Sequence, residues 1–254
     1  MAEKKKELAE VLSQEKIAAG IYSMWIRTSI AKTAVPGQFI SVYTKNDSRL
    51  LPRPISICET DTEKGALRIV YRIAGKGTEE FAAYQAGDAI SILGPLGNGF
   101  PLKEEPAFLI GGGIGIPPML ALAKKLNCEK NIVVGYRDEL FLQDELAKYG
   151  KVTIATEDGS AGTKGNVLDA IKAEGLSAKV IYACGPTPML RAIKQYAEEN
   201  AIEAWISLEE KMACGVGACL GCVCKSKETD DHSLVHNKRI CKDGPVFDAK
   251  EVEL

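Results

Sequence analysis

Histidine, long apolar runs and an excess of charge of one sign are scarce or missing in this 254-residue chain. The only two histidines, His232 and His236, are not paired with cysteines as a Rieske iron–sulfur centre requires, which excludes that centre. No apolar run reaches the ~18 residues of a membrane helix, so we expect no membrane anchoring. A net charge of −2 provides no basic field, so we expect no nucleic-acid partner.

Cysteine, in contrast, is abundant. Eight cysteines occur without a secretory signal, because the charged start at 1–7 is not followed by an apolar stretch. This combination indicates a reducing compartment and thiols used for metal or redox chemistry, so we predict a cytoplasmic protein. The length and the 46% hydrophobic content are sufficient for two domains or slightly more.

Four of the thiols form one pattern near the end of the chain. Cys214, Cys219 and Cys222 are spaced C-x4-C-x2-C, and Cys241 follows later, as in plant-type [2Fe–2S] proteins. The interspersed glycines allow the backbone to approach a cluster closely and to adopt positive φ. We therefore predict an iron–sulfur site with these four ligands.

Other ligand sets stay open on the sequence alone. Cys224 could replace Cys241, since residues two apart on a strand face the same side. Four thiolates also bind structural zinc, although zinc ribbons usually have two separate C-x2-C pairs and only one is present here. Disulfide pairing is a third alternative.

The first 100 or so residues favour β-structure. Alternating segments predict strands over 21–27, 38–43, 66–73 and 89–93, with turn residues between them. Short strands separated by turns are typical of a small antiparallel barrel.

Two stretches of this predicted barrel contain residues that packing alone does not explain. Arg53-Pro54-Ile55-Ser56 is one, and Tyr71-Arg72 followed by the turn at 75–78 is the other. Backbone amides at a helix start, with the Thr78 hydroxyl, can bind an anion, and Arg53 and Arg72 can contact a phosphate. The alternative is a pair of surface arginines beside an ordinary glycine-rich turn.

From about residue 106 strands and helices alternate. The predicted strands cover 107–110, 131–136, 151–156, 179–183 and 204–208, and the predicted helices cover 119–126, 138–149, 167–174 and a segment ending near 200. This order indicates a parallel sheet that binds ligands at the carboxyl ends of its strands. The glycine-rich loop at 111–118 and the Cys184-Gly185-Pro186 loop lie at such ends, although the glycine spacing is not G-x-G-x-x-G.

Together the motifs resemble those of the ferredoxin–NADP reductase superfamily. Arg53–Ser56 resembles its flavin motif, Gly77-Thr78 its flavin pyrophosphate contact, and 111–118 with 184–186 its nicotinamide motifs. The cysteine pattern, with Asp-Gly-Pro-Val-Phe at 243–247, is similar to that of electron-transfer subunits of NAD-dependent (class 1B) dihydroorotate dehydrogenases. The resemblance extends from about residue 5 to residue 250.

The resemblance implies three domains: an FAD-binding β-barrel at 1–101, an NAD-binding α/β domain at 102–207 and a [2Fe–2S] domain at 208–254. Electrons would pass from the FMN of a separate catalytic subunit through the cluster and FAD to NAD+, in pyrimidine biosynthesis. A heterotetramer with two copies of each subunit is expected. No residue of this chain needs to act as a general base.

The resemblance also assigns residues. The implied FAD contacts are Arg53, Pro54, Ile55, Ser56, Val70, Tyr71, Arg72, Gly77 and Thr78. The implied NAD contacts are Gly111, Gly112, Gly113, Gly115, Cys184, Gly185 and Pro186. The implied cluster ligands are Cys214, Cys219, Cys222 and Cys241.

Two other functions remain in view. The small subunit of a ferredoxin–NADP or sulfide reductase has the same domain order. The cluster motif of those relatives resembles one in which Asp replaces one Cys ligand, whereas four Cys are available here. A zinc-binding, nucleotide-sensing module would transfer no electrons.

Overall fold

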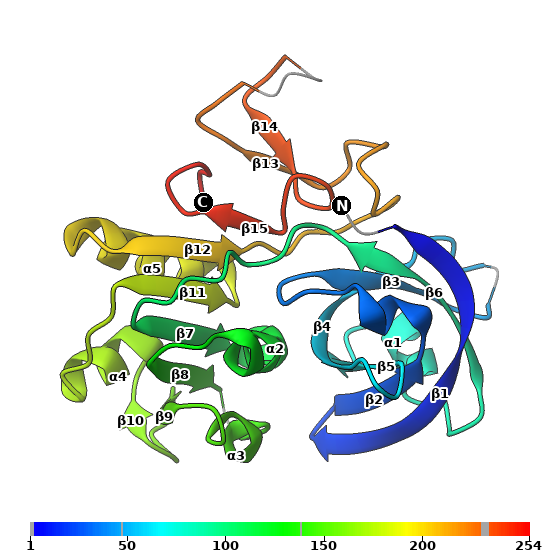
Figure 1. The fold of residues 1–254 in the computed structure, drawn as a ribbon, viewed down its shortest axis with the longest axis horizontal. Coiled ribbons are helices and arrows are strands. Elements are labelled where there is room, and N and C mark those ends of the chain that lie inside the picture. Colours follow the sequence, from blue (N-terminus) through cyan, green and yellow to red (C-terminus); the bar gives the residue numbers. More distant parts are fainter. Residues whose placement is uncertain (1–2, 47, 138, 230–233) are drawn as a thin grey trace.

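The computed structural model describes residues 3–46, 48–137, 139–229 and 234–254, and Figure 1 shows its three parts. A six-stranded antiparallel barrel is followed by a parallel α/β sheet, and a small C-terminal part lies across both. This confirms the expected fold class. None of the helices in the described ranges has the length and apolar character needed to cross a membrane.

The barrel closes in the order β1-β2-β5-β4-β3-β6. Its strands are β1 (Lys5–Ala18), β2 (Ile21–Arg27), β3 (Phe39–Tyr43), β4 (Arg53–Asp61), β5 (Ala66–Arg72) and β6 (Ala89–Leu96). Alternate residues such as Met24, Ile40 and Ile69 point inward and are fully buried. Phe81, at the end of the short helix α1 (Lys76–Phe81), joins this core.

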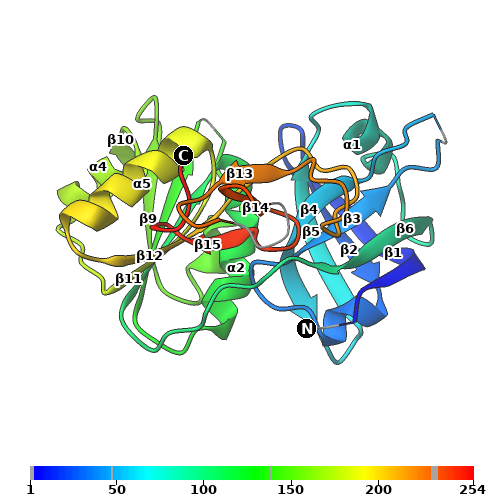
Figure 2. The same ribbon diagram turned by 90° about the horizontal axis from the view of Figure 1, so that it is seen from above.

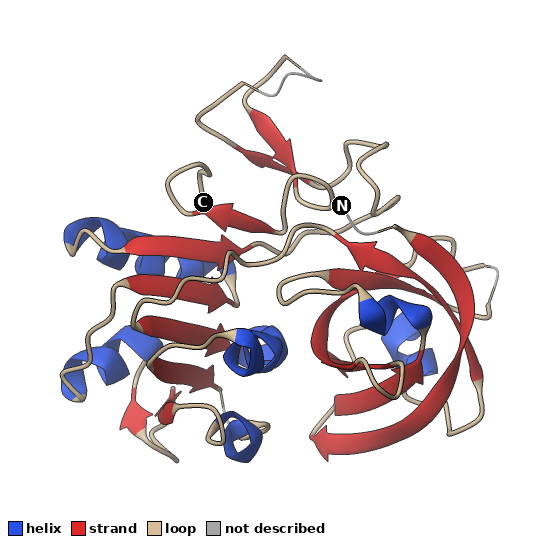
Figure 3. Ribbon diagram, in the orientation of Figure 1, coloured by secondary structure: helices blue, strands red, loops and turns tan. Residues whose placement is uncertain are grey.

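The second sheet has seven strands in the order β10-β9-β8-β7-β11-β12-β15. Its parallel strands are β7 (Ala107–Gly112), β8 (Lys130–Tyr136), β9 (Lys151–Thr156), β10 (Thr163–Lys164), β11 (Val180–Cys184) and β12 (Glu203–Ser207). Helices α4 (Val167–Ala173) and α5 (Thr187–Glu199) pack on one face, and α2 (Pro117–Lys125) and α3 (Gln143–Leu146) on the other (Figure 3). Strands covered on both faces are almost continuously apolar, as in 107–110.

One predicted helix is much shorter than expected. The prediction covered 138–149, but only Gln143–Leu146 is helical, and Asp138 lies outside the described residues. Leu142 has a left-handed φ of 63°, so no helix can continue through it. The Tyr136 hydroxyl donates to the Phe141 carbonyl (2.7 Å) and the two rings pack edge to face, which folds this segment back onto β8.

The C-terminal part is tied to the α/β sheet. A hairpin of β13 (Val223–Lys225) and β14 (Asn237–Arg239) follows the cysteine loop, and β15 (Val246–Asp248) then pairs antiparallel with β12. Residues 230–233, between the two strands of this hairpin, lie outside the described residues. Seen from above, hairpin and β15 lie over the junction between barrel and sheet (Figure 2).

A buried ion-pair network also joins the barrel to the α/β sheet. Arg68 on β5 donates two hydrogen bonds to the Glu145 carboxylate of α3, at 2.5 and 3.1 Å. Glu59 on β4 pairs with Lys124 of α2 and lies 3.4 Å from Arg68. Because the Arg68 side chain is only 9% exposed, this pair is largely shielded from solvent and connects the barrel to α3.

Candidate functional site

A cleft of about 670 Å³ opens between the barrel and the parallel sheet. Its walls come from β4, β5 and the start of α1 on one side, and from the ends of β7, β11 and β12 on the other. It therefore joins the predicted flavin and nicotinamide motifs in one space. The predicted residues that line it are Arg53, Pro54, Ile55, Ser56, Val70, Tyr71, Arg72, Thr78, Gly115, Cys184, Gly185 and Pro186.

Arg53 lies across the start of α1. Its guanidinium donates to the Leu51 carbonyl (2.5 Å) and packs directly against Gly77. A β-carbon at position 77 would overlap the Arg53 guanidinium, so any other residue there would displace this side chain. Gly77 does not line the cleft itself, but it makes room for an arginine that does.

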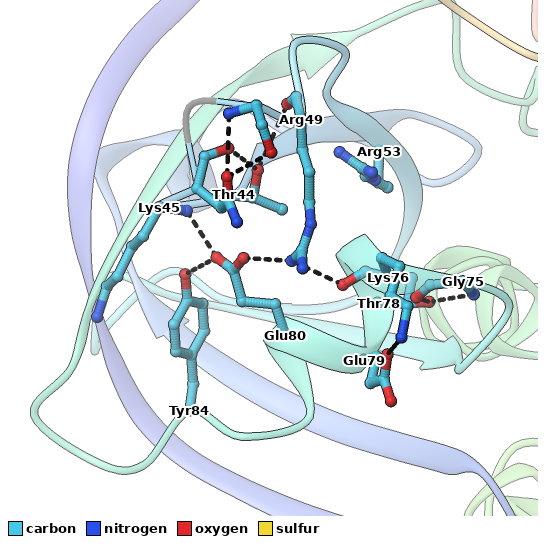
Figure 4. Close-up of polar contacts among 12 residues, drawn as sticks. Thr44, Lys45, Arg49, Arg53, Gly75, Lys76, Thr78, Glu79, Glu80 and Tyr84 are labelled. Carbon is cyan, nitrogen blue, oxygen red and sulfur yellow. Dashed lines mark hydrogen bonds and ion pairs between the residues drawn. The ribbon is translucent and has the colours of Figure 1, made fainter.

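The Thr78 hydroxyl shapes the turn before α1. It accepts the backbone N–H groups of Ala74 (2.9 Å) and Gly75 (3.2 Å) and donates to the Gly75 carbonyl (3.0 Å; Figure 4). Because α1 has only six residues, its dipole is small. Positive charge at this wall of the cleft comes mainly from Arg53 and Arg72.

Glu80 fastens the β3–β4 loop to α1. Its carboxylate accepts from Arg49 Nη1 (2.6 Å) and from the backbone N–H of Lys45 (2.6 Å), while Arg49 also donates to the Lys76 carbonyl (2.9 Å; Figure 4). The Tyr84 hydroxyl donates to the same carboxylate (3.2 Å). Arg49 is thus committed to a structural ion pair, whereas Arg53 faces the cleft.

The two predicted nicotinamide loops touch each other. β7 and β11 are neighbours in register, with Cys184 opposite Gly111, so their loops leave the same edge of the sheet. A side chain on Gly112 would meet Pro186 and Met189, and one on Gly115 would meet the Cys184 carbonyl. Gly113 has a φ of +52°, which glycine adopts without strain. Gly112 and Gly115 thus allow this contact, whereas Gly111, Gly112 and Gly113 do not line the cleft.

Cys184 is half-buried at the edge of the cleft, beside Ser207. Burial raises the pKa of its thiol from 9.0 to about 12, although a hydrogen bond with Ser207 opposes the shift. The thiol is therefore neutral at pH 7 and is not a nucleophile.

The four predicted cluster ligands lie together as two adjoining pairs. The Cys219 side chain lowers the pKa of Cys214, and the Cys222 side chain raises the pKa of Cys241, so each thiol lies beside the other member of its pair. Cys219 is exposed, whereas Cys222 and Cys241 are buried at 2% and 1% exposure. All eight cysteines are free thiols, so the disulfide alternative was wrong.

Backbone donors surround the Cys214 sulfur. It accepts N–H groups from Val216 (3.5 Å) and Ala218 (3.3 Å), because Gly215 and Gly217 turn the loop inward with φ values of +69° and +88°. Burial alone would raise the pKa of Cys214, but these donors and Cys219 outweigh it and lower the pKa to about 6. Burial and then the Cys222 neighbour raise the pKa of Cys241 to about 12.

This donor set fits an iron–sulfur group. Among the described residues, no three His, Cys, Asp or Glu side chains are grouped around one point as a single metal ion requires. A two-iron cluster instead takes two thiolates on each iron, which matches two pairs. The Cys224 sulfur contacts the Lys238 carbonyl (3.6 Å) across the hairpin.

Three family descriptions match consecutive parts of the chain. They are an oxidoreductase FAD-binding domain over 9–100, an oxidoreductase NAD-binding domain over 109–195, and the iron–sulfur cluster binding domain of dihydroorotate dehydrogenase B over 209–253. The dihydroorotate dehydrogenase B (NAD(+)) electron transfer subunit of Bacillus caldolyticus is 42% identical over 261 residues, covering 98% of this chain and 99% of that protein. The corresponding subunit of Fusobacterium nucleatum is 42% identical over 94% of this chain and 95% of its own length.

The chain belongs to this family of electron transfer subunits. It is an oxidoreductase subunit with FAD-binding, NAD-binding and iron–sulfur-binding domains. Among solved structures, an NADH-dependent reduced ferredoxin–NADP oxidoreductase chain is 31% identical, with a TM-score of 0.87 over 97% of this chain and 90% of that one. The FAD/NAD-binding domain of a Vibrio cholerae nitric oxide dioxygenase is 18% identical with a TM-score of 0.66, over 77% of this chain and 93% of that one, which shows a shared fold only.

Several residues of the cleft were not predicted. The segment 207–212 follows β12 at its carboxyl end, so the rule that selected the other two loops would have selected it as well. Phe39 and Pro245 carry no comparable signal in the sequence. The unpredicted lining residues are Phe39, Ala74, Ile114, Thr187, Ser207, Leu208, Glu209, Glu210, Lys211, Met212 and Pro245.

Proposed function

We propose that this chain transfers electrons from a catalytic dihydroorotate dehydrogenase subunit, through a [2Fe–2S] cluster and FAD, to NAD+. The supporting observation is the continuity of the two sites. Residues 207–212 line the cleft shared by the flavin and nicotinamide motifs, and Cys214 follows two residues later. A short path between carriers is what sequential electron transfer requires.

FAD would occupy the barrel side of the cleft. Arg53 and Arg72 would contact its phosphates, with the Gly77-Thr78 turn beside them, and Ser56, Val70 and Tyr71 would contact the ring system. Tyr71 suits a rigid contact, since its hydroxyl donates to Gln14 (2.7 Å). The nicotinamide nucleotide would lie on the loops at 111–115 and 184–186. Bound FAD supplies the chemistry, because a flavin exchanges single electrons with a cluster and a hydride with nicotinamide.

The thiol pairs suggest how the cluster is held. Cys214 and Cys219 would hold one iron, and the buried Cys222 and Cys241 the other. Cys224 would not be a ligand, because its sulfur is directed at Lys238. We retain the domain limits 1–101, 102–207 and 208–254, which agree with the ends of β6 at Leu96 and β12 at Ser207.

As an electron transfer subunit, the chain works with a catalytic dihydroorotate dehydrogenase subunit. We propose that this partner contains FMN and that two copies of each subunit assemble. The exposed apolar side chains Val216, Leu220 and Val223 flank Cys219 and would contact the partner. The eight free thiols support a cytoplasmic location.

Co-purification with the catalytic subunit tests this function. The complex should be yellow-brown, contain iron and FAD in roughly 2:1 ratio, and reduce NAD+ when dihydroorotate is added. A colourless, zinc-containing protein, or a coloured complex that cannot couple the two half-reactions, would contradict the proposal.

The similarity at TM-score 0.87 keeps the small subunit of a ferredoxin–NADP oxidoreductase as a second candidate. The four cysteines of this chain's cluster motif argue against that candidate, since the cluster motif of those subunits resembles one in which Asp replaces a Cys. NAD+ reduction by reduced ferredoxin, without any response to dihydroorotate in the partner complex, would favour the second candidate.

A further inference from the structure

Ser41 on β3 has a fully buried hydroxyl without a visible role in folding. Its exposure is 0%, and its Oγ has no hydrogen-bond partner among the described residues. Buried hydroxyls nearly always have a partner, so a donor left alone calls for an explanation. Valine or alanine would fill an apolar position on a strand without this cost.

The alternation of β3 determines where Ser41 points. Ile40 and Val42 belong to the barrel core, so Phe39 and Ser41 face outward. Phe39 lines the flavin cleft and packs into the apolar core shared by the α/β sheet and the cysteine loop. Ser41 is paired with Pro54 of the flavin motif on the adjacent strand. Ser41 thus stands beside the flavin motif and faces the C-terminal part.

The cysteine loop lies directly against this hydroxyl. A β-carbon built on Gly215 would be 2.9 Å from Ser41 Oγ, closer than a real side chain allows. Gly215 immediately follows Cys214. The unpartnered donor therefore lies where the barrel touches the loop that carries the first cluster ligand.

We propose that Ser41 is a positioning residue that donates its hydrogen bond to a sulfur of the bound iron–sulfur group at the Cys214 end of the loop. This inference rests on the proposed function, because it requires the cluster. The loop supplies its own N–H donors to Cys214, so Ser41 adds a donor from the flavin domain. Donors to cluster sulfurs stabilise the extra negative charge of the reduced state and so raise the reduction potential.

The test is an EPR-monitored redox titration of the complete, cluster-loaded protein. Ser41→Ala should keep the iron and FAD contents but lower the cluster midpoint potential by about 59 mV, a tenfold change in the one-electron equilibrium. Ser41→Thr keeps the hydroxyl and should restore the wild-type potential. Ser13→Ala, at an exposed serine on β1 of the same barrel, should change nothing.

An unchanged potential in Ser41→Ala, with a full [2Fe–2S] signal, would overturn the inference while leaving the proposed function intact. If Ser41→Ala fails to load iron, Ser41→Thr decides: a wild-type potential supports the role of the hydroxyl, and a lowered one contradicts it. A wild-type protein without any reducible [2Fe–2S] signal would overturn both the inference and the proposed function.

Discussion

Cys214 is set apart from the other thiols by its surroundings. The donors at Val216 and Ala218 stabilise its thiolate, and its pKa of about 6 lies well below the ordinary 9.0. A lowered folded-state pKa adds stability that is fully present above pH 9 and is lost as the pH falls through 6. The iron-free loop therefore already holds one ligand in the ionised form that binds metal.

Alkylation of the iron-free protein tests this ionisation. At pH 7 iodoacetamide should modify Cys214 well before Cys241, whose pKa is raised to about 12 by burial and by Cys222. The Cys214 rate should rise with pH through a midpoint near 6, as followed by peptide mass spectrometry. Buried Cys58 is the control and should stay unmodified. Equal labelling of Cys214 and Cys241 would contradict this assignment.

Serine substitutions distinguish the two possible fourth ligands. Cys241→Ser should abolish the [2Fe–2S] EPR signal, whereas Cys224→Ser should keep both iron content and signal, because Cys224 contacts Lys238. Loss of iron from the Cys224 variant alone would make Cys224 the ligand.

Substitutions at Arg53 and at Gly77 should both weaken FAD binding. Arg53→Ala removes a phosphate contact worth about 1.5–3 kcal/mol, which corresponds to roughly 10–100-fold weaker FAD binding. Gly77→Ala should weaken binding as well, since the new methyl group displaces the Arg53 side chain. The FAD content that remains after dialysis is measured for both variants. Arg27→Ala, at a mostly exposed pair on β2, is the control, and retention equal to that control would remove Arg53 from the FAD site.

At the scale of elements, strands with clear alternation or continuous apolar character could be predicted closely. Strand β9 spans the predicted 151–156, and β2 spans the predicted 21–27. Strand β1 was missed because charged residues occupy much of it and two register shifts interrupt its pairing with β2. Helix α3 was predicted too long because the Tyr136–Phe141 contact and the left-handed φ of Leu142 delay the start of the helix. A helical sequence pattern does not reveal either feature.

The contact between the barrel and α2–α3 depends on Arg68. Glu145→Gln removes the bidentate carboxylate partner of this buried guanidinium and leaves only the longer 3.4 Å pair with Glu59, so it should cost about 1–3 kcal/mol in unfolding free energy. It should also loosen the orientation of the two domains and weaken the NADH–flavin charge-transfer band in stopped-flow measurements. Lys151→Ala, at an exposed pair with Glu174, is the matched control. An unaltered band would show that this network does not set the cofactor geometry.

At the scale of the whole molecule, the three parts and most of the cleft could be predicted from the sequence. The contacts that hold the three parts together could not. Strand β15 lies more than 30 residues after β12 along the chain, yet it completes the same sheet and brings Pro245 to the cleft. Such pairing depends on tertiary packing, which no local pattern encodes. The segment 207–212 and Ser41 gain their importance only through this arrangement.

Anaerobic turnover of the assembled complex tests the central claim most directly. With Cys219→Ser, which removes an exposed thiol of the cluster loop, dihydroorotate-dependent NAD+ reduction should fall at least ~100-fold, while NADH oxidation by an artificial flavin-level acceptor stays near the wild-type rate. A cluster-free variant that still reduces NAD+ with dihydroorotate at the wild-type rate would contradict electron transfer through these cysteines.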